Sequence, residues 1–230
     1  MGKKKLRRFA ENATFENMFQ RNFEELEQDG FEFKGKWKKD FFHNDNPLVL
    51  ELACGKGEYT VNLARQFPDK NFIGLDIKGA RMWKGCKQSN NEGLKNVAFI
   101  RTQIELIQRY FGDGEVDEIW ITFPDPHLRK SRRKKRLTSP QFLARYHPLL
   151  NNNAIIHLKT DDNTLFTYTL EVIKEGKHKI HIQSEDIYKE QTPGPVTEFQ
   201  TFYEKMWLEE GKKIKYLCFS LNKDSFHVSE

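Results

Sequence analysis

From residue 47 onward, short apolar runs alternate with amphipathic segments. Seven runs rich in Val, Ile, Leu and Phe have the length and composition of buried strands, at 47–53, 71–77, 96–101, 116–123, 153–159, 178–187 and 212–221. Segments with helical spacing lie between them, at 59–67, 80–91, 104–111, 140–149, 163–174 and from 201. This alternation predicts an α/β fold, an open doubly wound and mostly parallel seven-stranded sheet with helices on both faces.

The first 46 residues have a different composition. They are rich in Lys, Phe and Asn and contain one segment, 14–28, that favours a short helix. We therefore expect an N-terminal basic and aromatic arm over 1–46, followed by a single α/β domain over 47–230.

Composition narrows the class of protein. With 230 residues, 37% hydrophobic and 13% aromatic, the chain has enough apolar material for a core, which excludes a wholly disordered protein. No run approaches the roughly 18 apolar residues of a membrane helix. The positive N-terminus has no apolar run after it, so we expect no secretory signal. Three scattered cysteines and unclustered histidines predict neither disulfides nor a metal site, and favour a reducing cytoplasm.

Positive charge is concentrated in two places. The chain carries +5, and residues 129–136 (RKSRRKKR) hold seven positive charges in eight residues. A second group contains Lys3, Lys4, Lys5, Arg7 and Arg8. Concentrated charge of this kind suits a polyanion such as nucleic acid, and the alternative is a solvated loop and tail.

The loop after the first strand has features of a nucleoside site. Gly55 and Gly57 allow a sharp turn and a close approach of the backbone to a ligand. Asp76 ends the next strand, where a carboxylate can accept hydrogen bonds from a ribose. Thr60 stands where a dinucleotide fingerprint has its third glycine, which argues against NAD and favours S-adenosylmethionine. Glu51 is placed for the methionine ammonium of that cofactor or for bracing the loop.

The loop after the fourth strand carries a constrained acid. Asp125 lies between Pro124 and Pro126, so φ is fixed on both sides, and Phe123 and Asp125 are biased toward extended conformations. The parallel topology brings this loop to the same sheet edge as the glycine turn. We interpret Asp125 as a catalytic carboxylate beside the cofactor, and the alternative is a turn aspartate.

These segments resemble the bacterial tRNA (guanine-N7-)-methyltransferases, the TrmB family. The resemblance is carried by LELACGKGEYT, NFIGLDIKGARMWKG, EIWITFPDPHLRKSRRKKRLTSPQFL, IIHLKTDD and TFYEKMWLEEGKKIKYLCF, within about residues 48–219. The most discriminating parts are PDP with its basic continuation and the C-terminal TFYE. The family fold is a Rossmann-like class I methyltransferase whose last strand is antiparallel.

The resemblance implies methyl transfer from S-adenosylmethionine to N7 of the guanosine at position 46 of tRNA. Cofactor positions of the family fall on Glu51, Asp76, Gln103 and Asp125, with the glycine turn of Gly55 and Gly57, and Asp125 is also the catalytic position. Substrate positions fall on Arg129, Asp161, Thr201, Phe202, Tyr203 and Glu204. Three residues depart from the usual pattern: Gln103 replaces an acid or Asn, His127 replaces an aromatic residue, and Arg129 replaces Lys.

The chemistry needs alignment more than proton transfer. Guanine N7 already carries a lone pair, so no strong base is required, and holding N7, the methyl carbon and sulfur in line is worth several kcal/mol. Carboxylates such as Asp125, Asp161 and Glu204 can stabilise the positive charge that develops on the purine. Extruding a stacked base costs a few kcal/mol, which phosphate contacts from 129–136 can offset.

Other interpretations remain open at the level of sequence. One is a methyltransferase that acts on an exocyclic amine, as in N6-adenine methylation, although His127 replaces the aromatic residue of such loops. Another is a non-catalytic RNA-binding module that kept the fold, and an NAD dehydrogenase is a distant third. Individual residues also have structural alternatives: Asp76 as a helix cap, and Glu204 in a surface salt bridge. Asp161 could cap the helix at 163–174, although Asp162 fits that cap better. A monomer and a homodimer are both compatible with the sequence.

Overall fold

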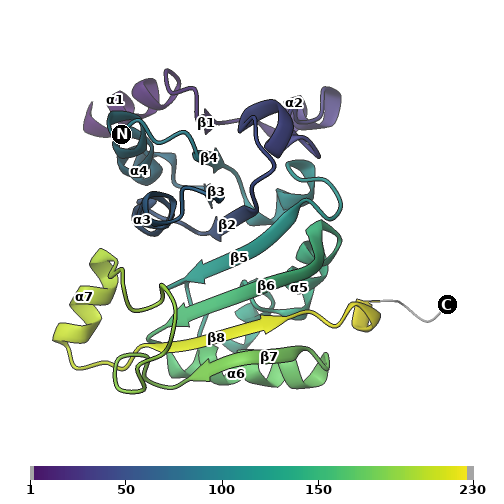
Figure 1. Ribbon diagram of the computed structural model, residues 1–230, viewed down its shortest axis with the longest axis vertical. Coiled ribbons are helices and arrows are strands. Elements are labelled where there is room, and N and C mark those ends of the chain that lie inside the picture. The colour runs from purple at the N-terminus through teal and green to yellow at the C-terminus, as the bar shows by residue number, and fades with distance from the viewer. Residues whose placement is uncertain (1–2, 227–230) are drawn as a thin grey trace.

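The computed structural model describes residues 3–226 and contains one eight-stranded sheet (Figure 1). Its order is β1-β4-β3-β2-β5-β6-β8-β7. The strands are β1 (Met18–Phe19), β2 (Leu48–Leu52), β3 (Asn71–Asp76), β4 (Val97–Arg101), β5 (Val116–Thr122), β6 (Leu150–Thr160), β7 (Lys179–Ser184) and β8 (Lys215–Ser220). The pairs from β1 to β6 are parallel, and β8 runs antiparallel to β6 and to β7. The predicted α/β fold with an antiparallel last strand is therefore confirmed, with β1 as an additional eighth strand.

Helices cover both faces of the sheet (Figure 1). The α-helices are α1 (Lys3–Asn12), α2 (Phe23–Gln28), α3 (Glu58–Gln66), α4 (Gly79–Asn91), α5 (Pro140–Tyr146), α6 (Asn163–Glu175) and α7 (Phe202–Glu209). Shorter helical turns are η1 (Trp37–Phe41), η2 (Ile104–Arg109), η3 (Lys130–Lys135), η4 (His147–Leu149) and η5 (Lys223–Phe226). No helix within residues 3–226 has the length and apolar content needed to cross a membrane.

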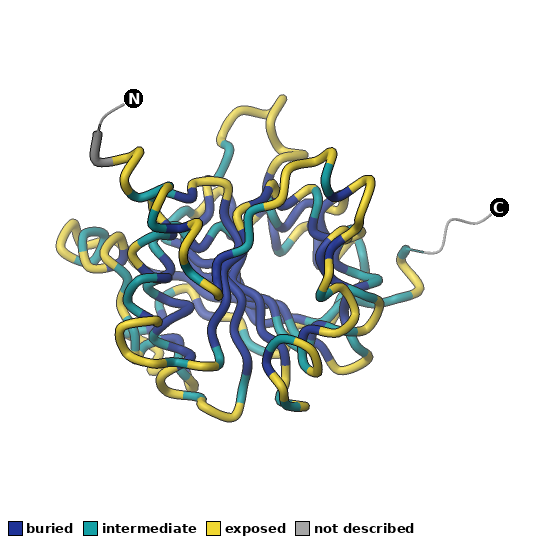
Figure 2. The backbone as a smooth tube through the Cα atoms, turned by 90° about the horizontal axis from the view of Figure 1, so that it is seen from above, coloured by how far each residue is buried: buried dark blue, intermediate teal, exposed yellow. Residues whose placement is uncertain are grey.

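Two hydrophobic clusters correspond to the two faces. One contains the buried side chains of α3 and α4, and the other contains those of α5, α6 and η2. Figure 2 shows the buried strands running through the centre with exposed backbone on either side. A strand buried on both faces explains why the sequence shows continuous apolar runs such as VAFI rather than strict alternation.

The prediction of one short helix over 14–28 is confirmed for 23–28 and wrong for 14–22. The chain turns after α1, forms β1 beside β4, and begins α2 only at Phe23, where Asn22 makes a capping box with Glu25. Phe19 explains the strand, because its ring packs edge-on against Trp37, which is fully buried. Much of the segment before residue 47 is thus packed against the sheet.

The topology brings four strand ends to one edge. In Figure 1 the arrowheads of β5 and β6 point toward α7, and β2 and β3 run parallel to them. Loops that follow these strands therefore meet there.

Candidate active site

A cavity of about 550 Å³ opens at this edge of the sheet. Residues from the glycine turn, the end of β3, the loop after β5, the loop after β6 and α7 line it. Seven residues that the sequence singles out are among them: Glu51, Gly55, Asp76, Asp125, Asp161, Thr201 and Tyr203. Segments more than a hundred residues apart in sequence thus form one concave site.

Asp76 braces the glycine turn. Its Oδ2 accepts a hydrogen bond from the amide of Gly55 (2.9 Å), and its Oδ1 accepts one from the amide of Lys78 (2.7 Å). Gly55 adopts φ 58°, and a Cβ added there would meet only the carbonyl oxygen of Ala53, at 4.0 Å. The turn therefore offers bare backbone to a ligand, and Asp76 fixes its position.

Gly57 acts in packing rather than in lining the cavity. With φ 69° it precedes α3, and a Cβ there would lie 2.6 Å from the ring of Phe99. Thr60, at the third glycine position of the fingerprint, packs against Gly74 of β3. A Cβ on Gly74 would lie 2.9 Å from the Thr60 hydroxyl, so the threonine fits because residue 74 has no side chain. Gly74 thus accommodates the threonine that replaces the third glycine of a dinucleotide motif.

Glu51 is buried beneath the turn, with 4% of its surface exposed. Oε2 accepts hydrogen bonds from the Thr60 amide (2.8 Å) and hydroxyl, and Oε1 accepts one from the Thr122 hydroxyl (2.7 Å). Burial raises the pKa of Glu51 from 4.5 to about 7, against the opposing effect of these hydrogen bonds, and the nearby Asp76 carboxylate raises it further. Glu51 therefore connects β2 to the first turn of α3 and to the end of β5, and it changes charge near neutral pH.

The loop after β5 is strained at the position where the chain enters it. Phe123 has φ 49°, in the left-handed region, and its amide donates to the Lys159 carbonyl (2.8 Å). The expectation of an extended Phe123 is therefore wrong, because this hydrogen bond to β6 overrides the bias from Pro124. Asp125 follows with a side chain that is 72% exposed, and its Oδ1 accepts from the amide of His127 (2.9 Å).

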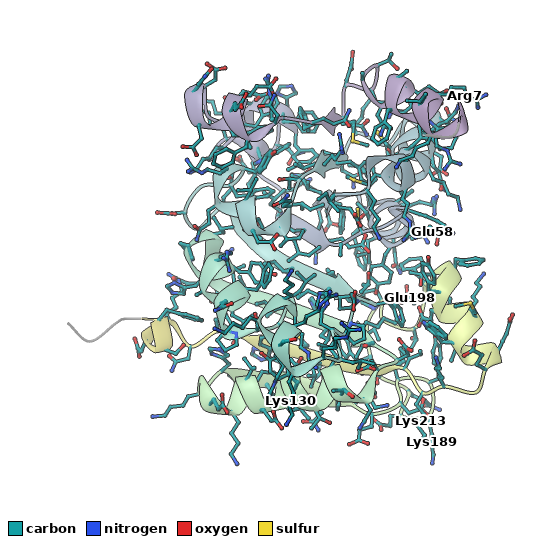
Figure 3. The ribbon with its side chains drawn as sticks, turned by 180° about the vertical axis from the view of Figure 1, so that it is seen from behind. Arg7, Glu58, Lys130, Lys189, Glu198 and Lys213 are labelled. Carbon is teal, nitrogen blue, oxygen red and sulfur yellow. The ribbon has the colours of Figure 1, made fainter. Side chains whose placement is uncertain are left out.

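The opposite wall comes from the C-terminal segment. Thr201 caps α7, and the amide of Phe202 donates to Oε2 of Glu58 on α3 (3.1 Å). Figure 3 shows Glu58 beside α7. Lys56 of the glycine turn lies over the ring of Phe202, 4.0 Å from its centroid, while Tyr203 lines the cavity. Phe202 itself is exposed and does not line the cavity.

Glu204 does not line the cavity. It is fully buried, pairs with Lys159 (2.7 Å), accepts from the Tyr188 hydroxyl (2.8 Å) and completes the capping box with Thr201. The structure thus gives Glu204 a supporting position behind the wall. The sequence signal for this position of Glu204 is Lys159, at the end of the apolar run IIHLK. A lysine in a buried strand requires an acidic partner.

Two further predicted residues lie outside the cavity. Gln103 lines a neighbouring hollow with Arg101 and Phe23, and Ile77 lines both hollows. Arg129 is exposed just before η3. Asp162 caps α6 by accepting from the Leu165 amide (2.6 Å), as the sequence favoured, and both Asp161 and Asp162 line the cavity.

The sequence missed three buried residues that support this site, namely Thr122, Lys159 and Arg136. Thr122 lines the cavity and donates to Glu51 of β2, whereas Lys159 and Arg136 donate to backbone carbonyls of the loops before α7 and after β5. A nucleoside cofactor fits the arrangement, since the cavity has the size of small-molecule sites and combines open glycine backbone with a braced carboxylate. Within residues 3–226, no three His, Cys, Asp or Glu side chains group as metal ligands.

Known proteins resemble this chain over most of its length. Residues 45–217 match a protein family described as "Putative methyltransferase". A tRNA (guanine-N(7)-)-methyltransferase of Christiangramia forsetii is 57% identical, covering 95% of this chain and 98% of the relative. One of Bacteroides fragilis is 51% identical, covering 96% and 87%. Among solved structures, the 16S rRNA methyltransferase KamB matches with a TM-score of 0.61 at 15% identity, covering 81% of this chain and 93% of that one, which supports the fold alone. The chain therefore belongs to the tRNA (guanine-N(7)-)-methyltransferase family.

Proposed function

We propose that the protein transfers a methyl group from S-adenosylmethionine to N7 of the guanosine at position 46 of tRNA. The observation that carries the proposal is the convergence on one cavity of the turn braced by Asp76, the acid Asp125 and the α7 wall. The names of relatives that are 51–57% identical support the same reaction.

The floor of the cavity suits the cofactor, which when bound supplies an electrophilic methyl group. Asp76 holds the turn with one lone pair on each oxygen and keeps further acceptor capacity for the ribose hydroxyls. Gly55 allows the backbone to approach, and Glu51 supplies negative charge beneath the turn for an ammonium group. Ile77 lines both this cavity and the neighbouring hollow that contains Gln103, and we assign Gln103 to the adenine of the cofactor.

Asp125 is the residue we assign to the chemical step. Because N7 attacks with its own lone pair, the protein needs no strong base, and a carboxylate beside the purine instead stabilises the positive charge that develops there. Its exposed side chain, fixed at one oxygen by the His127 amide, leaves the other oxygen free to accept from guanine N–H groups. Asp161, which also lines the cavity and lies 3.6 Å from the Lys212 ammonium, is a second carboxylate for the purine.

The exposed cations of Arg129 and η3 suit the phosphates of tRNA. Arg129, Lys130, Arg132, Lys134 and Lys135 are exposed and have no salt-bridge partner among residues 3–226. Phosphate contacts of this kind offset the few kcal/mol that base extrusion costs, and they weaken steeply with salt. Phe202 and Tyr203, with Lys56 over both rings, offer a stacking surface near the opening.

The test is to incubate the purified protein with an unmodified tRNA transcript and methyl-labelled S-adenosylmethionine, and then to digest the product to nucleosides. We expect the label in 7-methylguanosine, and none when position 46 of the transcript is changed to adenosine. Label in N6-methyladenosine would overturn the proposal, and absence of both cofactor binding and transfer would favour a non-catalytic RNA-binding module.

A further inference from the structure

One arginine of the basic segment differs from its neighbours. Arg136 is 3% exposed, whereas the other cations of residues 129–136 are exposed. A phosphate-binding side chain must reach solvent, so burial gives Arg136 a different partner. Its contacts within residues 3–226 include no salt bridge, and its charge is therefore met by carbonyl dipoles and an aromatic ring.

Those contacts lie on the turn that carries Asp125. The Arg136 Nε donates to the carbonyl oxygen of Pro126 (2.8 Å), and its Nη2 donates to that of His127 (3.3 Å). On its other side the guanidinium lies over the ring of Tyr168 on α6, 4.4 Å from the centroid. Arg136 thus connects the two residues after Asp125 to a helix of the core.

The turn needs such support. His127 has φ 44°, a left-handed conformation that is strained for a residue with a side chain. The amide of His127 is also the donor that holds Asp125 Oδ1. If the carbonyls of Pro126 and His127 were released, His127 could relax, and the hydrogen bond that orients Asp125 would be lost with it.

Arginine suits this position better than lysine. A planar guanidinium can donate to two successive carbonyls from a fixed fork while it stacks on a ring. A lysine carries the same charge but is a point donor on a flexible stem, so it cannot reproduce both contacts and the stacking together.

We propose that Arg136 is a positioning residue that fixes the turn of Asp125 for methyl transfer and does not contact tRNA phosphates. The proposal rests on the proposed function, because that function gives Asp125 its role in the chemical step. It divides the basic segment into exposed residues that bind the polyanion and a buried residue that orients the acid.

The experiment compares Arg136→Lys with Arg145→Lys. Arg145 is a matched control, because it also lies over a ring, that of Phe142, and donates to a backbone carbonyl, that of Gln141, but it lies on α5. We expect Arg136→Lys to lower kcat at saturating tRNA at least tenfold, with tRNA Kd and cofactor Kd within twofold of wild type. Arg145→Lys should leave all three quantities unchanged.

The salt dependence of tRNA binding separates positioning from phosphate contact. Arg132→Met removes an exposed cation and should flatten the slope of log Kd against log salt. Arg136→Met should leave the slope unchanged while kcat falls. A wild-type kcat in Arg136→Lys, or a slope in Arg136→Met that flattens as in Arg132→Met, would overturn the proposal.

Hydrogen exchange supplies a readout that does not depend on activity. In the full-length protein, Arg136→Lys should raise exchange of the His127 amide at least tenfold, with the amides of β5 unchanged. Tyr168→Leu, which removes only the ring, should raise it by a smaller factor. Unchanged exchange in both variants would contradict the positioning role of Arg136, whatever the activity of the protein. A wild-type protein that methylates no tRNA would refute the proposed function and leave the exchange test of Arg136 standing.

Discussion

Replacing Glu51 with Gln tests the role of the buried carboxylate beneath the glycine turn. The amide has nearly the same shape and can keep the existing hydrogen bonds, since its oxygen accepts from Thr60 and its NH₂ donates to Thr122, whose hydroxyl rotates to accept. The substitution therefore removes the charge with little change in packing.

The size of the effect follows from the raised pKa of Glu51. Its pKa rises from 4.5 to about 7 on folding, and a change of one in pKa corresponds to about 1.36 kcal/mol, so ionisation costs the folded state about 3 kcal/mol. The folded-state pKa is the higher one, so the protonated carboxyl is the form that the folded protein favours. The folded protein therefore avoids this cost below pH 4.5, and it loses about 3 kcal/mol of stability as the pH rises from 4.5 to above about 7. Glu51→Gln should therefore stabilise the protein at pH 8, by roughly 6–12 °C in melting temperature, and much less at pH 5.5.

Thermal unfolding of both proteins from pH 5.5 to pH 8 measures this difference, with the exposed Glu16→Gln as a control that should show no such trend. Calorimetry of the cofactor gives the functional counterpart. An ammonium group near Glu51 favours its ionised form, so wild-type affinity should rise with pH up to about 7, whereas Glu51→Gln should bind more weakly and without that rise. A variant that gains no stability at pH 8, or that binds the cofactor as wild type does, would refute the reasoning.

Three further experiments, with four substitutions, test the site and its support. Asp125→Ala should reduce methyl transfer by about 10²–10³-fold while tRNA binding persists, because the exposed cations are untouched, and unchanged turnover would remove Asp125 from the chemical step. Asp76→Ala should weaken cofactor binding by about 1–3 kcal/mol, measured by calorimetry, and an affinity within twofold of wild type would exclude ribose recognition. Lys159→Met leaves the fully buried Glu204 carboxylate without its ion-pair partner and should cost about 3–5 kcal/mol in urea unfolding. Adding Glu204→Leu should recover much of that stability, and a double variant less stable than Lys159→Met would contradict the pairing.

Periodicity was enough for the seven strands of the sheet that follow residue 47. Strands buried on both faces leave continuous apolar runs, and the runs at 71–77 and 96–101 correspond to β3 and β4 with shifts of one residue at their ends. The parallel topology then places the ends of β2, β3 and β5 at one edge, which is why the sequence alone assigns Asp76 and Asp125 to one site.

Long-range contacts account for what the sequence did not indicate. Local propensity over 14–28 favours a helix, but Phe19 packs on Trp37, and pairing with β4 gives a strand. Charge alone groups Arg136 with its neighbours, and only the position of Tyr168 on α6 shows that it is buried. Glu204 follows a tyrosine at the surface, and its burial depends on Lys159, 45 residues earlier in the chain.

We expect this cavity to present guanine N7, and no other atom, for methyl transfer. This expectation can be tested with a tRNA that carries 7-deazaguanosine at position 46, where a carbon replaces N7 and the other guanine edges are unchanged. This tRNA should bind with the same Kd as the unmodified transcript, inhibit competitively and accept no methyl group. Methylation of the 7-deaza tRNA at the rate of the unmodified one would contradict the expectation.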